Sequence, residues 1–259
     1  MLELPDRLPP GALCDGTGEI LAGDLAPTGA LWFAGSELIT DGAGAVTGWG
    51  AKLGPRVARP TSPNTGNARL GAAGDLTGLQ CRDGLHCGFV IEEVATTAGT
   101  LTFAARYLPP PGGDAKTVVT FNTGGATRKL PSENYLFLSE ADGVVTVKDD
   151  KALVEVTLPV PPADAPRLVI VSLAGERLAV EVMGGARSEV QAGAPVLSGA
   201  ASLFIGCRNQ RPGLAKTLGG AIIADLLLWP RRALLMPADA TDRAALTAMR
   251  RFQLWAEDG

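Results

Sequence analysis

The stretch ASLFIGCRNQRPGLAKTLGGAIIADLLLW, from Ala201 to Trp229, contains two apolar runs separated by a polar loop. The first run is Leu203–Cys207, and the second extends from Gly220 to Trp229. The loop between them is rich in Arg, Asn, Gly and Pro. Short apolar runs on either side of such a loop are typical of strands and not of helices. The pattern therefore predicts two neighbouring strands of a β-sheet, and no catalytic motif accompanies them.

The same kind of pattern recurs through the middle of the chain. In ALVEVTL, for example, Val154, Val156 and Leu158 alternate with Glu155 and Thr157, which predicts a strand with one buried and one solvated face. Roughly eleven to thirteen strands follow one another, with turn signals about every ten residues, as in an all-β sandwich. The predicted strands include Leu31–Phe33, Ala45–Trp49, Gly88–Ala95, Thr100–Leu108, Lys116–Asn122, Asn134–Ser139, Gly143–Lys148, Ala152–Leu158, Arg167–Leu173 and Arg177–Met183.

The two ends of the chain differ from this middle part. Residues 1–28 are rich in Pro, Gly and Asp and show little periodicity, which predicts an extended N-terminal arm whose leucines contact a partner. Residues 29–259 are expected to form one β domain that includes a C-terminal helix. Asp239 and Asp242 mark the start of this helix, and apolar residues then follow at helical spacing. We expect the helix to dock on the sandwich.

Composition narrows the function classes. With 259 residues, of which 46% are hydrophobic, the chain is long enough for a sizeable core. Its net charge of -4 argues against nucleic-acid binding, which requires a basic face. An uninterrupted apolar run of about 18 residues is absent, so membrane insertion is not expected. The first residues, MLELPDRLPPGALC, lack the basic and then apolar pattern of a signal peptide, so synthesis in the cytoplasm is expected.

The four cysteines, Cys14, Cys81, Cys87 and Cys207, do not form a CxxC pair. Cys81 and Cys87 flank His86, the only histidine, but a zinc site needs four ligands from closely spaced pairs, and a fourth ligand is not evident. A disulfide between Cys81 and Cys87 remains an alternative. Our expectation is free, partly buried thiols and no metal.

Three stretches resemble the concanavalin A-like, laminin-G-like jelly roll, of the kind found in surface or spike proteins of phages and gene-transfer-agent particles. They are LWFAGSELITDGAGAVTGWGAKLG near the start, RLVIVSLAGERLAVEVMGG in the middle, and SLFIGCRNQ with LGGAIIADLLLW followed by a helix near the end. The resemblance covers about residues 29–255. It implies an all-β, two-sheet antiparallel jelly-roll sandwich with a short C-terminal helix, in a family that includes glycosidases, lectins and particle-surface binding modules.

Carboxylate spacing argues against catalysis. Glycosidases of this family place their acids close together on one strand, in an E-x-D-x-x-E-like arrangement, and this sequence has no such triplet. Glu92 and Glu93 are adjacent and are expected to point to opposite faces, whereas Glu140 and Asp142 lie in a turn-like segment. His86 is the single candidate base for a Ser-His-Asp site. We therefore expect no enzyme activity.

Calcium is a further alternative, because some relatives hold it between loops. It requires several oxygen ligands, and the candidate acids Asp41, Asp75, Asp142 and Asp149 are scattered along the chain. No calcium ligand and no cofactor is assigned.

The leading hypothesis is a non-catalytic module that recognises host cell-surface polysaccharide from the head or tail spike of a phage-like particle. Sugar sites in such sandwiches combine an aromatic platform with Asn and Arg side chains. For Trp49, burial in the core is the alternative to a platform. The candidate ligand-binding residues are Trp49, Asn64, Asn67, Arg208, Asn209, Gln210 and Arg211.

Two other functions remain open. One is a structural or adaptor protein of the particle that makes only protein contacts, and the other is a glycoside hydrolase. We expect the 1–28 arm to bind other particle proteins and the module to form a homo-oligomer on the particle surface.

Overall fold

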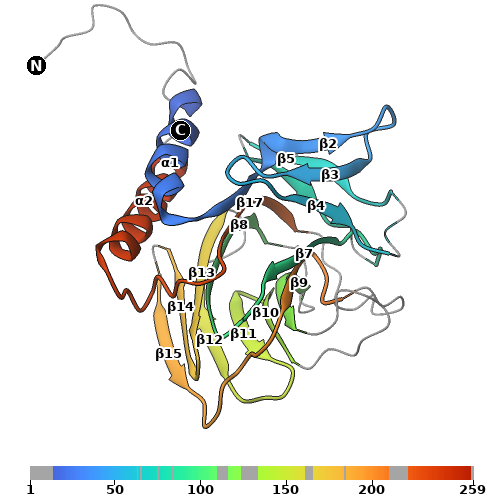
Figure 1. Ribbon diagram of the computed structural model, residues 1–259. Helices are drawn as coiled ribbons and strands as arrows, with labels where there is room; N and C mark the ends of the chain where they lie inside the picture. The colour runs from blue at the N-terminus through green and yellow to red at the C-terminus, as the bar shows by residue number, and fades with distance from the viewer. Residues whose placement is uncertain are drawn as a thin grey trace, which may run out of the picture.

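A computed structural model of the chain describes residues 14–62, 64, 66–74, 76–82, 84–109, 116–123, 134–160, 166–183, 185–209 and 221–257, with the backbone alone described at 14–17 and 253–257. Two antiparallel sheets pack face to face, and two helices lie against one side of this sandwich (Figure 1). The predicted all-β sandwich with a C-terminal helix is confirmed.

Sheet I has eight strands in the described part of the chain, in the order β15-β14-β13-β8-β17-β6-β5, and β1 also pairs with β17. Every pair is antiparallel. The strands are β1 (Leu31–Ala34), β5 (Arg69–Ala73), β6 (Leu76–Gln80), β8 (Thr100–Leu108), β13 (Arg167–Ala174), β14 (Arg177–Val182), β15 (Arg187–Gln191) and β17 (Ile222–Trp229).

Sheet II has nine described strands in the order β12-β11-β10-β9-β16-β7-β4-β3-β2. Its pairs are also antiparallel. The strands are β2 (Leu38–Thr40), β3 (Val46–Gly50), β4 (Val57–Pro60), β7 (Phe89–Ala95), β9 (Lys116–Thr123), β10 (Tyr135–Ala141), β11 (Val144–Asp149), β12 (Glu155–Pro159) and β16 (Ala201–Ile205).

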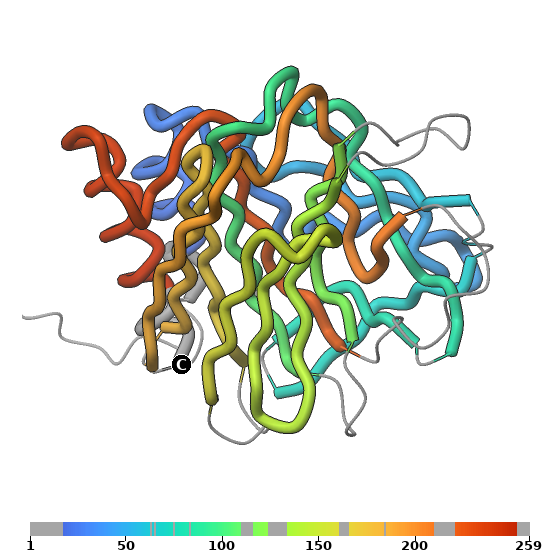
Figure 2. The backbone as a smooth tube through the Cα atoms, turned by 90° about the horizontal axis from the view of Figure 1, so that it is seen from below, coloured from blue at the N-terminus to red at the C-terminus, as the bar shows by residue number. Residues whose placement is uncertain are grey.

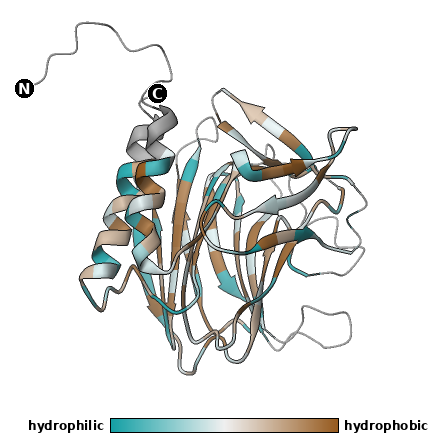
Figure 3. Ribbon diagram, turned by 45° about the horizontal axis from the view of Figure 1, so that its top comes forward, coloured by the Kyte–Doolittle hydropathy of each residue, from teal (hydrophilic) through white to brown (hydrophobic). Residues whose placement is uncertain are grey.

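The alternation of side chains along each strand explains why sheet I is covered on both of its faces. On β8, Phe103 and Ala105 join the main core between the two sheets, whereas Ala104 joins a second apolar cluster on the opposite face of sheet I. On β17, Leu228 and Leu227 divide in the same way. Successive side chains of a strand point to opposite faces, so sheet I is apolar on both faces and needs a cover on each. Apolar segments are accordingly frequent along the strands (Figure 3).

The second cover of sheet I is a pair of helices, α1 (Cys14–Leu25) and α2 (Ala240–Glu257). They lie side by side along one side of the sandwich (Figures 1 and 2). Leu21 and Leu25 of α1 and Leu246 and Met249 of α2 belong to the same apolar cluster as the outer face of sheet I. Two short 3-10 helices, η1 (Ala26–Thr28) and η2 (Gly35–Glu37), flank β1.

The N-terminal prediction was wrong for its described part. Residues 14–25 form α1 and are not an extended arm, since leucines one turn apart let the helix bury one side against α2 and sheet I. Residues 1–13 lie outside the described residues. The predicted start of α2 is confirmed: Asp239 accepts a hydrogen bond from the Asp242 N–H at 2.8 Å, and Asp242 accepts one from Ala238 N–H at 2.9 Å. No described helix is long and apolar enough to span a membrane.

The pair of strands predicted within Ala201–Trp229 exists, but the strands are not neighbours. β16 lies in sheet II between β7 and β9, whereas β17 lies in sheet I between β8 and β6. Both strands are buried along their whole length, so their apolar patterns are alike and carry no information about which sheet each one joins.

Candidate functional site

The outer face of sheet II, opposite the side that meets sheet I, carries a row of polar side chains. Asn122 on β9 is paired with Ser202 on β16 and with Tyr135 on β10. Directly paired residues of neighbouring strands point to the same face, so these three side chains lie together. Asn122 and Ser202 are buried, and Tyr135 is half-buried.

A second row runs parallel to the first. Thr120, two residues before Asn122, is paired with Phe204 on β16 and with Phe137 on β10. All three side chains are buried. The two rows together make a floor of hydroxyl, amide and aromatic groups across three adjacent strands.

Arg208 follows β16 and lies over this floor. Its guanidinium carbon is 3.7 Å from the centre of the Phe137 ring, its Nε donates to Thr117 Oγ1 at 3.1 Å, and its carbonyl accepts from Asn122 Nδ2 at 3.1 Å. A cation over an aromatic face is held by the ring quadrupole. Burial raises the pKa of the Tyr135 phenol, as does its hydrogen bond with Asp150, while Arg208 opposes the rise. Arg208 is therefore fixed in place before a ligand binds.

Two polar atoms of the floor have no hydrogen-bond partner among the residues that the structure describes. They are Thr120 Oγ1 and Asn122 Oδ1, and both are buried. An unsatisfied buried polar atom costs about 1–3 kcal/mol, and most buried polar atoms in proteins are paired. We call Thr117, Thr120, Asn122, Tyr135, Phe137 and Arg208 the sheet-face site. The two unpartnered oxygen atoms of this site can each accept a hydrogen bond from a ligand hydroxyl group.

Comparisons with known proteins bear on the fold. No family model and no curated protein matches the chain. Among solved structures, the chain is similar to Trypanosoma rangeli sialidase in complex with sialic acid, with a TM-score of 0.58 and 12% identity over 91% of this chain. The chain has the fold of a two-sheet antiparallel jelly-roll sandwich. The match spans 38% of the sialidase, so the likeness concerns the fold and not that enzyme's activity.

Two further similarities to solved structures are weaker. The Ruminococcus gnavus IT-sialidase CBM40 bound to alpha2,3 sialyllactose matches with a TM-score of 0.43 and 11% identity, covering 59% of this chain and 84% of that chain. A heptameric SAP-like pentraxin from Limulus polyphemus matches with a TM-score of 0.45 and 13% identity, covering 69% of this chain and 79% of that chain.

Within the jelly roll, the predicted Asn64 and Asn67 lie in a loop that they stabilise. Asn64 Nδ2 donates to the Gly88 carbonyl at 3.1 Å, and Asn67 Nδ2 donates to the His86 carbonyl at 3.3 Å. Burial lowers the pKa of His86, and a hydrogen bond with the backbone of Asn209 opposes the shift. The structure thus gathers Asn64, Asn67 and Asn209 around His86, with Arg208 next along the chain.

Of the remaining predicted residues, only Trp49 lies within the described part of the chain, and it is not on the outer face of sheet II. Trp49 is fully buried in the core of the jelly roll, where its Nε1 donates to the Ala34 carbonyl at 2.7 Å, so the prediction of a sugar platform there was wrong. A Trp buries a large apolar area, and this one contacts Phe33 edge-on. Gln210 and Arg211 lie outside the described residues. Thr120 and Asn122 were missed, because their strand was interpreted only as part of the core.

The acids singled out in the sequence serve the structure. Glu140 lies within β10, not in a turn, and is buried against Arg167 and Tyr107. Asp149 is also buried, and its carboxylate accepts the N–H groups of Leu153 at 2.8 Å and Val154 at 2.9 Å. Among the described residues, no group of three or more His, Cys, Asp or Glu is suited to hold a metal ion.

The described cysteines of the jelly roll, Cys81, Cys87 and Cys207, are free and buried, so the alternative of a Cys81–Cys87 disulfide does not hold. Burial raises the pKa of all three thiols, that of Cys207 to about 12.

Because the thiolate is the reactive form, we expect these three thiols to resist alkylation at mildly alkaline pH while the protein is folded. Iodoacetamide labelling read by peptide mass spectrometry measures this for each cysteine. Labelling after unfolding in guanidinium chloride is the control. Rapid labelling of Cys207 in the folded protein would contradict its burial.

Proposed function

We propose that this chain is a non-catalytic carbohydrate-binding module whose ligand binds at the sheet-face site. The observation that carries the proposal is the pair of buried, unpartnered atoms, Thr120 Oγ1 and Asn122 Oδ1, beside a pre-positioned arginine. Both side chains are 0% exposed, so a ligand reaches them only after the groups that cover them move aside. Hydroxyl protons donated to both atoms would then recover the free energy that their burial costs.

The chemistry of the site fits a sugar in three respects. The Thr120 hydroxyl both donates and accepts, and the Asn122 amide oxygen accepts, which matches the hydroxyl groups of a pyranose. Tyr135 is half-buried at the rim and offers an aromatic surface to sugar C–H groups. Arg208 has a guanidinium held on Phe137, so it loses little conformational entropy when a ligand oxygen binds to it.

The absence of catalysis is part of the proposal. Glu140 and Asp149 do not line the sheet-face site: Glu140 lies between the sheets with Arg167, and Asp149 holds a turn. The Asp150 carboxylate does lie at the site, where it is engaged by the Tyr135 hydroxyl. A glycoside hydrolase requires two carboxyl groups on either side of the scissile bond. We therefore propose recognition without hydrolysis.

The proposal extends to the biological setting. The sequence resemblance to surface proteins of phages and gene-transfer-agent particles supports a position on such a particle, with host cell-surface polysaccharide as the ligand. A homo-oligomer, and contacts of residues 1–28 with other particle proteins, stay predictions. Immunogold labelling of purified particles would test the location.

The decisive variant is Thr120→Val, which removes only the unpartnered hydroxyl and keeps the shape of the side chain. We expect the free energy of unfolding to stay the same or rise by up to about 1–3 kcal/mol, because the variant removes a buried unsatisfied group. Affinity for the glycan should fall about tenfold, since a hydrogen bond to the ligand is lost. Calorimetric titration and urea unfolding measure the two effects.

The glycan for this titration comes from an array of bacterial capsular and cell-wall polysaccharides probed with the wild-type protein. Thr77→Val, on an exposed position of sheet I, is the matched control and should change neither quantity. Equal glycan affinity of Thr120→Val and wild type would place the ligand elsewhere. If no array glycan binds while the protein assembles with itself, the adaptor function is favoured instead.

A further inference from the structure

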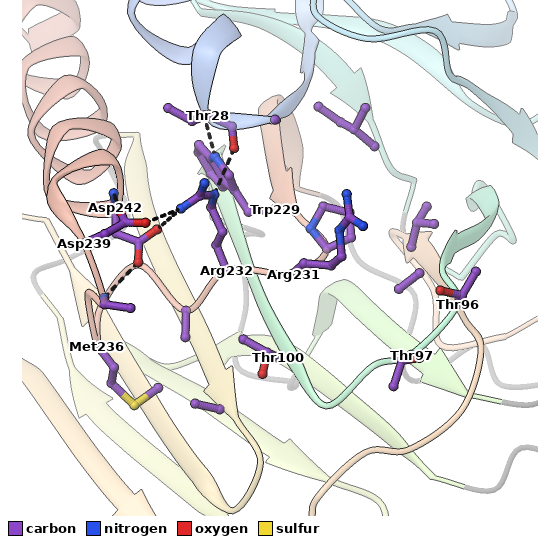
Figure 4. Close-up of a pocket in the computed structure, with 18 of the residues that line it drawn as sticks. Thr28, Thr96, Thr97, Thr100, Trp229, Arg231, Arg232, Met236, Asp239 and Asp242 are labelled. Carbon is purple, nitrogen blue, oxygen red and sulfur yellow. Dashed lines mark hydrogen bonds and ion pairs between the residues drawn. The ribbon is translucent and has the colours of Figure 1, made fainter.

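A groove of about 1100 Å³ has a lining that includes none of the sheet-face residues (Figure 4). Its walls are the segment around η1, the turn between β7 and β8, and the connection from β17 to α2. This volume is at the upper end of the range for small-molecule pockets, so it has room for a ligand of several linked units. Trp229 borders the groove but is 1% exposed, so its ring is not available for stacking.

The end of the groove near α2 carries one more negative than positive charge, because two acids there pair with one arginine. Arg232 pairs with Asp242 at 2.7 Å and with Asp239 at 3.2 Å (Figure 4), and its Nε donates to the Thr28 carbonyl at 3.1 Å. With both acids paired to one arginine and the guanidinium engaged on both sides, this end has no cation to offer a ligand.

The opposite end has an available cation. Arg231 is exposed and lines the groove (Figure 4), and no hydrogen bond or ion pair engages it within the described part of the chain. Arg56 is nearby in the lining and donates to the carbonyls of Glu92 at 3.4 Å and Glu93 at 3.2 Å. The Glu93 carboxylate is the one acid of this end. Two arginines against one glutamate leave it with a net positive charge.

The wall between the arginines and β8 carries hydroxyl groups. Thr96, Thr97 and Thr100 are all exposed and line the groove (Figure 4). Each hydroxyl both donates and accepts, which suits the hydroxyl groups of a saccharide. A peptide strand would need an open sheet edge, but β7 and β8 are each paired on both sides. The lining therefore favours a saccharide over a peptide.

We propose that this groove is a second binding site, for an acidic oligosaccharide whose carboxylate pairs with Arg231 and whose hydroxyl groups meet the three threonines. An arginine binds a carboxylate through two parallel N–H···O bonds, which gives both affinity and orientation. The groove lining contains none of the six sheet-face residues, although the Glu93 N–H donates to Ser202 Oγ, beside Asn122, at 3.1 Å. The two sites therefore hold separate ligands or separate units of one long chain.

The probe is an α-1,4-linked hexasaccharide of galacturonic acid, and its fully methyl-esterified form is the neutral control with the same skeleton. Calorimetric titration of the wild-type protein should show binding of the acid form. Arg231→Gln, or esterification of the probe, should weaken binding about 10- to 100-fold, the ratio that corresponds to one charge-assisted hydrogen bond. Glu93→Gln should strengthen it, because a like charge is removed.

Two control variants locate the effect. Arg177→Gln changes an exposed arginine on β14, and Thr120→Val changes the sheet-face site; neither should alter binding of the acid form. Failure of the acid form to bind, or equal binding by Arg231→Gln, would overturn the proposal. So would equal affinity for the esterified probe, or stronger binding of a hexaglutamate peptide at the same groove. Loss of binding in Thr120→Val alone would assign the acidic saccharide to the sheet-face site.

Discussion

Replacing Arg167 by Met is expected to lower the free energy of unfolding by about 3–5 kcal/mol, because it leaves a buried carboxylate without its cation. Arg167 on β13 and Glu140 on β10 join the two sheets, with Nε and Oε1 at 2.9 Å and side chains only 6% and 3% exposed. The Tyr107 hydroxyl donates to the other carboxylate oxygen at 2.7 Å. Tyr107 alone would not offset the burial of the negative charge.

Urea unfolding of the single variants and of the double variant Glu140→Leu/Arg167→Met measures this. Replacing a buried ion pair by apolar residues is often neutral, so the double variant should be more stable than either single one. The exposed pair Lys148–Glu155 is the control, and its loss should change stability by less than about 1 kcal/mol. A loss below about 1 kcal/mol for Arg167→Met would contradict a large contribution of this buried pair to stability.

Trp49→Ala is the second large effect, with an expected loss of about 3–5 kcal/mol of stability. The indole is fully buried, contacts Phe33 at a ring distance of 6.2 Å, and bonds the Ala34 carbonyl. The substitution leaves a cavity in the core and an unpaired carbonyl. Thermal and urea unfolding report the loss.

The variant Trp49→Phe distinguishes a role of the tryptophan in core packing from a role in glycan binding. It keeps most of the apolar volume, so its loss of stability should be smaller than that of Trp49→Ala, and its glycan affinity should equal that of the wild type. A selective loss of glycan affinity in the stable Trp49→Phe variant would restore the tryptophan as a binding platform.

Local pattern predicted most strands, because alternation and apolar runs depend only on neighbouring residues. β8 has the bounds that were predicted, and β13 and β14 form the predicted hairpin. Strand pairing was not predictable in the same way, since it depends on contacts between distant segments. β16 and β17 show this clearly, because adjacent segments with alike patterns joined different sheets.

The segment from Ala51 to Gly88 contains β4, β5 and β6, and none of these three strands is among those predicted from the sequence. Its glycines misled the prediction. A Cβ at Gly78 would lie 2.3 Å from the Ile223 carbonyl oxygen, so glycine is required there by the close approach of β17 and does not mark a turn. β15, with its RSEVQ sequence, was missed because it is an exposed strand at the edge of sheet I.

The site was predictable in part. Arg208 and Asn209 stood out as polar residues between two apolar runs, and both lie at or beside the sheet-face site. The floor was hidden inside KTVVTFN, where Thr120 and Asn122 are spaced by two in an otherwise apolar strand. Residues two apart in a strand point to the same face of the sheet. This spacing was therefore the feature of the sequence from which the polar floor could have been predicted. Only the cross-strand register shows that the face is the outer one.

The helical layer also sets how the domain can be presented. The start of α1 and the end of α2 lie near each other, on the side of sheet I (Figure 1). Polypeptide joined ahead of α1 or after α2 thus departs from the back of the sandwich, whereas the sheet-face site occupies the front. A scaffold that holds the domain at the start of α1 or the end of α2 would leave that site facing outward.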